Sequence, residues 1–100
     1  MSMSTEARLA LLLLEEVELR GGKVRLRFLK VYRLVAYWLG KNYAGNLISK
    51  LVASGYLSIK DDSVELLRRF KANRTIMQVY REARELVIST YLAMQRPLSR

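Results

Sequence analysis

The sequence predicts one mainly helical domain with a small β-hairpin. One hundred residues suffice for about one domain, so residues 1–100 are expected to form a single unit. The chain is 51% hydrophobic, which is enough to bury a core. Apolar residues recur at helical spacing in some segments and at strand spacing in others, and glycines separate most of these segments.

The first helix is predicted over residues 5–20, with Ser4 and Thr5 at its capping position. Its apolar run, residues 9–14, occupies so much of the circumference that neighbours must cover two sides. A short strand is predicted over residues 23–27, where apolar and basic residues alternate. Val24 and Leu26 are expected to point inward.

Two helices separated by a glycine are predicted next. The first spans residues 28–39, and Gly40 ends it. Asn42 is expected to cap the second helix, over residues 43–54. The inward face of this second helix is expected to consist of Ala44, Leu47, Ile48, Leu51 and Val52.

A hairpin and a long helix complete the prediction. Two alternating runs, residues 56–59 and 64–67, flank turn-forming residues. Their register is expected to align one face of the hairpin, made by Leu57, Ile59, Val64 and Leu66. A helix over residues 74–95 follows a basic link.

The composition excludes several function classes. Cys and His are both absent, which removes disulfides, thiol nucleophiles, imidazole bases and most transition-metal sites. We therefore expect no enzyme, no cofactor and no metal site. The longest apolar run is residues 9–14, far short of the ~20 residues of a membrane span. Because a secretory leader pattern is also missing, we expect no membrane partner and a cytoplasmic, nucleoid-associated location.

The charge of the chain is unevenly distributed. The formal net charge is +9. Residues 1–20 contribute −2, residues 61–100 contribute +3, and residues 21–60 contribute +8 without a single acidic residue. Such a segment repels itself, which favours a polyanionic partner; a solvated basic face is the alternative. Asn and Gln are scarce and Arg outnumbers Lys 12 to 6, a pattern typical of thermophiles.

The segment 31–57 contains a motif with known relatives. Ala36 is a small residue where one helix would cross the next, and Gly40 follows it by four residues. The second helix ends in Leu51, a short spacer and the run 55–57, Gly-Tyr-Leu. This pattern resembles the helix-turn-helix of winged-helix transcription factors, and the match covers about residues 28–68. A departure is Lys41, where many relatives carry an apolar residue.

The layout, with one long helix after the hairpin, is similar to PadR-type and small archaeal dimeric winged-helix proteins, which include plasmid and virus regulators. The resemblance implies a winged helix-turn-helix with a long C-terminal dimerisation helix. It also implies double-stranded DNA and a second copy of the chain as partners.

The polar face of the 43–54 helix is expected to read base edges in the major groove. There Asn46 suits adenine and Lys50 suits guanine or phosphate. Four basic residues around the start of the 28–39 helix are expected to clamp a phosphate at its N-terminus. The hairpin tip is acidic, at Asp61 and Asp62, so we expect either that it stays out of the minor groove or that Arg68 and Arg69 at its foot contact the backbone instead. The complete expected DNA-binding set is Arg25, Arg27, Lys30, Arg33, Lys41, Asn42, Tyr43, Asn46, Ser49, Lys50, Lys60, Arg68 and Arg69.

An apolar stripe on the last helix is expected to form a homodimer seam, because a domain of this size cannot cover so much apolar surface alone. Packing against the first helix of the same chain is the alternative. The stripe consists of Ile76, Tyr80, Ala83, Val87, Tyr91 and Met94.

We expect a homodimeric transcriptional regulator that binds DNA without chemistry. An architectural or plasmid-segregation protein that coats DNA fits the same residues. A more distant alternative is a protein-interaction module that uses the hairpin or the last helix. The acid-free segment 21–60 disfavours that alternative.

Overall fold

The computed structural model describes residues 3–69 and 71–95, and its central element is α1 (Thr5–Leu19). Ser4 caps this helix as predicted, because its hydroxyl accepts a hydrogen bond from the Ala7 N–H. Most residues from Leu9 to Val17 are buried. The helix contacts the other helices and the sheet, which explains why its circumference is apolar.

α2 (Lys30–Leu39) and α3 (Lys41–Ala53) are joined by Gly40 alone. Gly40 has a φ of 101°, a conformation that residues with a side chain rarely adopt. The prediction of Asn42 as a cap is wrong, because α3 begins at Lys41 and Asn42 lies within it. Gly40 itself occupies the capping position of α3, and its carbonyl accepts a hydrogen bond from the Ala44 N–H at 3.1 Å.

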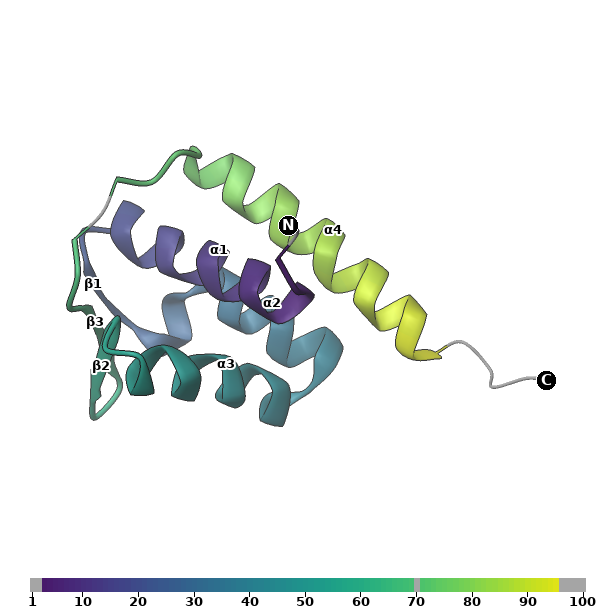
Figure 1. Ribbon diagram of the computed structural model, residues 1–100, viewed down its shortest axis with the longest axis horizontal. Coiled ribbons are helices and arrows are strands. Elements are labelled where there is room, and N and C mark those ends of the chain that lie inside the picture. Colours follow the sequence, from purple (N-terminus) through teal and green to yellow (C-terminus); the bar gives the residue numbers. More distant parts are fainter. Residues whose placement is uncertain (1–2, 70, 96–100) are drawn as a thin grey trace.

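A three-stranded antiparallel sheet lies at one end of the molecule (Figure 1). Its strands are β1 (Lys23–Arg25), β2 (Leu57–Lys60) and β3 (Ser63–Leu66), in the order β1-β3-β2. The predicted hairpin register is confirmed, since Leu57 pairs with Leu66 and Ile59 with Val64.

The segment after β1 differs from the prediction. The strand is shorter than expected because Leu26–Phe28 form a 3-10 turn, η1, which precedes α2. Val24 and Leu26 still pack against the core, as predicted. Phe28, however, is 51% exposed and is not part of the helix.

α4 (Ile76–Gln95) begins with reciprocal hydrogen bonds between Thr75 and Gln78. The Gln78 N–H donates to the Thr75 hydroxyl at 3.2 Å, and the Thr75 N–H donates to the Gln78 side-chain oxygen at 2.9 Å. The helix packs across α1 and α2, and its C-terminal part extends beyond the other elements (Figure 1).

The middle of the expected dimer stripe lies inside this chain. Ala83 and Val87 have no exposed surface, because they pack with Val79 into the same core as α1 and α2. The alternative of packing within the chain therefore holds for these residues, and the seam predicted through them is wrong. Helical periodicity identified a buried face but not the surface that covers it.

The other stripe residues lie around that core. Tyr80 is half-buried, and Tyr91 packs edge-on against Trp38 of α2 with ring centroids 5.2 Å apart. Ile76 is half-buried, and Met94 is 58% exposed. The six residues therefore do not share one free surface.

Two adjacent carboxylates of α1 are buried and connect the helices. Glu16 accepts hydrogen bonds from the N–H groups of Lys30 at 2.7 Å and Val31 at 2.8 Å, and from the Tyr80 hydroxyl at 3.1 Å. It thereby holds α1, the start of α2 and α4 together.

Glu15, the other buried carboxylate, accepts hydrogen bonds from Arg74 at 2.8 and 2.9 Å. Arg74 also pairs with Glu82 of α4 at 2.9 Å. These contacts fasten the start of α4 to α1, so both buried acids of the first helix serve the packing of the chain.

Candidate nucleic-acid interface

α3 turns one face to the core and the opposite face to solvent. Its buried residues are Ala44, Leu47, Ile48 and Leu51. Asn42, Asn46 and Ser49 are exposed, and their spacing of four and three residues aligns them on one outer stripe. Val52, predicted to point inward, is 39% exposed and lies beside this stripe. The structure thus brings three of the predicted groove-reading residues together.

Gly45 lies on the same side of α3, and nothing in the fold explains it. Its φ is not in the left-handed range, and a Cβ added there would meet no atom within 4 Å. A glycine inside a helix costs roughly 0.5–1 kcal/mol relative to alanine. The absence of a side chain keeps this part of the surface low, which allows another molecule to approach the helix backbone closely.

Two lysines lie on either side of the stripe. Lys41 is exposed at the start of α3, while Lys50 pairs with Glu6 of α1 at 3.0 Å. Both partners of that pair are more than half exposed, at 66% and 52%, so solvent weakens it. A phosphate can therefore replace Glu6 as the partner of Lys50.

Tyr43 differs from the other predicted residues of α3. It is half-buried and packs against the core, and burial raises the pKa of its hydroxyl above the ordinary value. Its ring therefore contributes to the packing of the domain, and the structure does not place it on the outer stripe.

The predicted phosphate clamp at the start of α2 is wrong. The N–H groups of Lys30 and Val31, which would bind the anion, already donate to the buried Glu16. A helix N-terminus stabilises one negative charge, and here a carboxylate of the same chain supplies it. The sequence signals the burial but not the partner, because Glu15 and Glu16 lie between Leu14 and Val17 in a helix expected to be covered on two sides.

Lys30 is directed toward α4 and not toward the α3 stripe. The Lys30 ammonium lies 4.9 Å from the centre of the Tyr80 ring, which places it on the side of α2 that faces α4. Arg33 is exposed on α2. The helix end that the four predicted bases would surround is therefore occupied by Glu16, and Lys30 lies over the Tyr80 ring.

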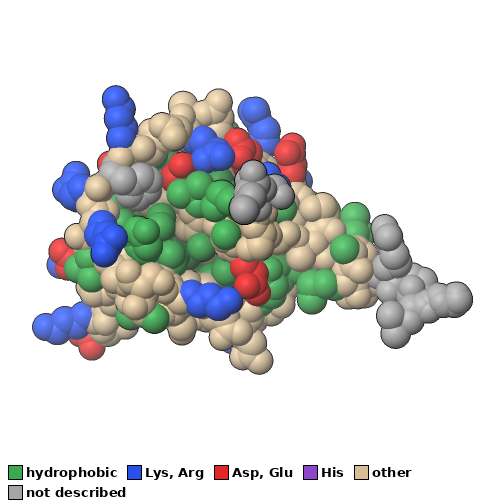
Figure 2. All heavy atoms as spheres, viewed as in Figure 1, with side chains coloured by type: hydrophobic (Ala, Val, Ile, Leu, Met, Phe, Trp, Pro, Cys, Tyr) green, Lys and Arg blue, Asp and Glu red, His purple; other side chains and the backbone are tan. Residues whose placement is uncertain are grey.

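The sheet carries a second basic surface. Lys23, Arg25 and Lys60 line a hollow of about 600 Å³ together with Phe28 and the acidic turn 61–62. Figure 2 shows Lys and Arg side chains projecting around the end of the molecule that carries the sheet. The two carboxylates of the turn thus lie among bases, which reduces their repulsion of a polyanion.

Two more of the predicted arginines stack on aromatic rings. The guanidinium of Arg27 lies 5.2 Å from the centre of the Phe28 ring, and that of Arg68 lies 5.2 Å from the Tyr56 ring. Such stacking orients the cation and leaves its N–H groups free to donate. Arg69 is exposed at the foot of the hairpin.

Comparison with known proteins finds no matching family model, no similar curated protein and no similar solved structure. Within residues 3–69 and 71–95, no helix combines the length and hydrophobicity that crossing a lipid bilayer requires. The same residues contain no group of three or more acidic side chains placed to hold a metal ion. The function is therefore inferred from the geometry and charge of the described surfaces.

Proposed function

We propose that this chain is a winged helix-turn-helix protein that binds double-stranded DNA and regulates transcription. The order of its elements supports this proposal, because α2 and α3 form a helix pair and the β2–β3 hairpin follows α3. In helix-turn-helix proteins the second helix of the pair lies in the major groove. α3 is the second helix here.

The outer face of α3 is the observation that carries the proposal. It combines exposed Asn42, Asn46 and Ser49 with a glycine that the fold does not require. Short side chains that both donate and accept hydrogen bonds suit base edges, and a low surface lets the helix enter a groove. None of these three polar side chains takes part in the hydrogen bonds found within the described residues.

The proposed contacts to bases and the proposed contacts to phosphates have different roles. Asn46, near the middle of α3, pairs with adenine through its side-chain amide and supplies sequence preference. Arg25, Lys60 and Arg68, which are exposed on and beside the sheet, contact phosphates and supply affinity that depends on salt. α3 packs against β2, so the two surfaces are carried by neighbouring elements.

A pair of charge reversals tests the proposal. Lys41→Glu changes a lysine at the edge of the α3 stripe, while Lys71→Glu changes an exposed lysine in the link before α4. The two variants have the same net charge, so a difference between them reports position alone. Binding to a labelled random duplex is measured by fluorescence anisotropy.

We expect Lys41→Glu to weaken binding by at least about tenfold and Lys71→Glu to weaken it much less. Equal effects would show that binding follows net charge without a defined α3 interface. A footprint on DNA fragments selected from a genomic library then distinguishes a transcriptional regulator from a protein that coats DNA. Discrete half-sites indicate a regulator, whereas protection that spreads along the DNA indicates a protein that coats it.

A further inference from the structure

The hollow of about 600 Å³ beside the β2–β3 turn combines three kinds of side chain. It is lined by an aromatic ring, three cations and two carboxylates, with Val24 and Ser63 between them: Phe28; Lys23, Arg25 and Lys60; Asp61 and Asp62. Pockets that bind small organic ligands have volumes of roughly 300–1,000 Å³. The hollow therefore has room for a ligand of the size of a nucleotide.

The carboxylates of this hollow have acceptors to offer a ligand. Among residues 3–69 and 71–95, no ion pair and no side-chain hydrogen bond involves Asp61 or Asp62. Asp62 is the more buried of the two. Its backbone carbonyl accepts a hydrogen bond from the Leu26 N–H at 2.9 Å, which holds it beside the 3-10 turn that carries Phe28.

Phe28 presents an aromatic ring that the core does not use. The side chain is 51% exposed and belongs neither to the core nor to the residues packed against it. The Arg27 guanidinium lies 5.2 Å from the centre of the ring, but Arg27 does not line the hollow. The cation thus covers another side of the ring, and the side toward the hollow can stack on a planar group.

These groups match the parts of one class of ligand. A nucleobase stacks on an aromatic ring, and lysine and arginine bind phosphate. A carboxylate only accepts hydrogen bonds, so it selects a base with two adjacent donors on its Watson–Crick edge. Guanine has such an edge, formed by its N1–H and its amino group. Adenine and cytosine present an acceptor beside their amino group instead.

We propose that this hollow binds an unpaired guanine nucleotide. The base stacks on Phe28, and the Asp62 carboxylate accepts hydrogen bonds from the N1–H and the amino group of guanine. The cations of the hollow pair with the phosphate. In duplex DNA these donors of guanine are bonded to cytosine, so the ligand is a free nucleotide or a guanine in a single strand. The site is therefore distinct from the duplex interface proposed above.

The preference for guanine is tested by titrating the isotope-labelled protein with the 5′-monophosphates of guanosine, inosine and adenosine and following the amide resonances. Inosine lacks the amino group of guanine, and adenosine also lacks the N1–H. We expect guanosine monophosphate to bind at least about fivefold more tightly than inosine monophosphate and at least about tenfold more tightly than adenosine monophosphate. The shifts should concentrate on residues 23–28 and 60–63. Since the three ligands carry the same phosphate, equal affinities would overturn the proposal, as would shifts confined to other residues.

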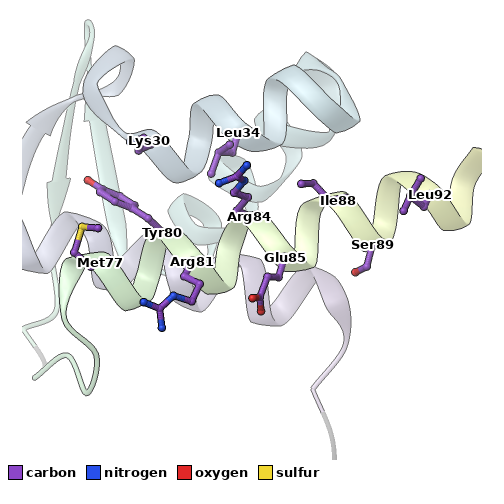
Figure 3. A pocket seen from close by; sticks show the side chains of 10 residues that line it. All are labelled: Lys30, Leu34, Met77, Tyr80, Arg81, Arg84, Glu85, Ile88, Ser89 and Leu92. Carbon is purple, nitrogen blue, oxygen red and sulfur yellow. The ribbon is translucent and has the colours of Figure 1, made fainter.

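The role of Asp62 is tested by two variants that each remove one negative charge. Asp62→Asn sets an amide that also donates against the donors of guanine, so the preference over adenosine monophosphate should fall below about twofold. Glu85→Gln is the control, because Glu85 projects from α4 in another hollow, of about 940 Å³ (Figure 3). This variant should keep the full preference. An Asp62→Asn protein that still prefers guanine would overturn the proposal.

Stacking is tested by replacing two exposed aromatic residues with leucine. Phe28→Leu should weaken the binding of all three nucleotides by about fivefold or more, because leucine is not planar. Tyr37→Leu changes a ring that is 82% exposed and lies outside the hollow, so it should leave binding unchanged. Amide resonances that stay in place away from the substitution show that each variant keeps its fold. Equal effects of the two substitutions would contradict stacking on Phe28.

A comparison of two oligonucleotides identifies the source of the nucleotide. One is a short oligothymidine strand with a single guanine at its centre, and the other contains thymidine alone. Tighter binding of the first strand indicates a guanine within a single strand, whereas equal binding of both strands together with a preference for guanosine monophosphate indicates a free nucleotide. Both results support the site, and the absence of any guanine preference in strands and mononucleotides would overturn it. Duplex DNA takes no part in these titrations, so a chain that binds guanine but no duplex would contradict only the proposed function.

Discussion

Gly45 destabilises α3, and no contact within the described chain requires a glycine at this position. Gly45→Ala should raise the free energy of unfolding by about 0.5–1 kcal/mol, because alanine favours the helix and the added methyl group meets no neighbour. In the proposed complex the same methyl group would lie between α3 and the DNA major groove, so the affinity for DNA should fall. Urea unfolding and anisotropy measure the two effects. A variant that is more stable and binds DNA as tightly as the wild type would show that α3 does not enter a groove.

Asn46 is expected to supply base recognition. Asn46→Ala should cost about 1–3 kcal/mol on the preferred duplex and little on random DNA, because phosphate contacts do not depend on sequence. Asn73→Ala, at an exposed position in the link before α4, is the matched control and should affect neither duplex. Equal losses on both duplexes would assign Asn46 to the backbone and shift the residues that read bases.

Glu16 connects three helices, because this residue of α1 accepts hydrogen bonds from α2 and α4. Glu16→Gln should lower the free energy of unfolding by about 2–4 kcal/mol, because an amide cannot replace all the bonds that the buried carboxylate accepts. The exposed Glu65 of β3 provides the control, and Glu65→Gln should change stability by less than about 0.5 kcal/mol. Urea unfolding of the three proteins is the measurement. Similar stabilities would contradict the role assigned to the buried network.

Tyr80 of α4 connects this network to pH. Burial is the main cause that raises the pKa of its hydroxyl above the ordinary value of 10.0. The folded chain therefore holds this proton more tightly than the unfolded chain does. The resulting stabilisation is complete below pH 10 and is lost as the pH rises through the folded pKa. Tyr80→Phe should flatten the fall in urea midpoint above pH 10, whereas an unchanged fall would show that other groups cause it. Part of the fall should remain, since burial also raises the pKa of Tyr43.

Element boundaries followed from the sequence where local chemistry decides them. The hairpin register could be predicted because alternation and the turn determine it, and Gly40 marked the junction of two helices. The prediction for Asn42 is wrong because α3 begins directly after Gly40, which occupies the capping position. The occupied N-terminus of α2 depends on a contact 14 residues away, between Lys30 and Glu16, which local patterns do not encode.

The surface that covers the buried face of α4 could not be predicted from the sequence. Periodicity correctly marked Ala83 and Val87 as buried, but the covering surface belongs to the same chain. Another side of α4 lines a hollow in which charged residues lie between Met77 and Leu92, so no continuous apolar stripe marks it in the sequence.

Across the whole molecule, the acidic and basic residues are sorted by role. The two buried acids of α1, Glu15 and Glu16, accept hydrogen bonds from groups of the same chain, whereas many bases of the sheet and α3 are exposed. The surface is therefore more basic than an even distribution would make it. This arrangement supports binding to a polyanion over an extended area.

The salt dependence of duplex binding tests this account most directly. If four to six bases of each chain contact phosphates, the slope of log K against log salt should be about −7 to −11 for a dimer. Titration of a labelled duplex at several salt concentrations gives this slope. A value in that range is the result expected for docking through α3 and the sheet together. A slope shallower than about −3 would contradict such an interface, because too few phosphates would then be neutralised.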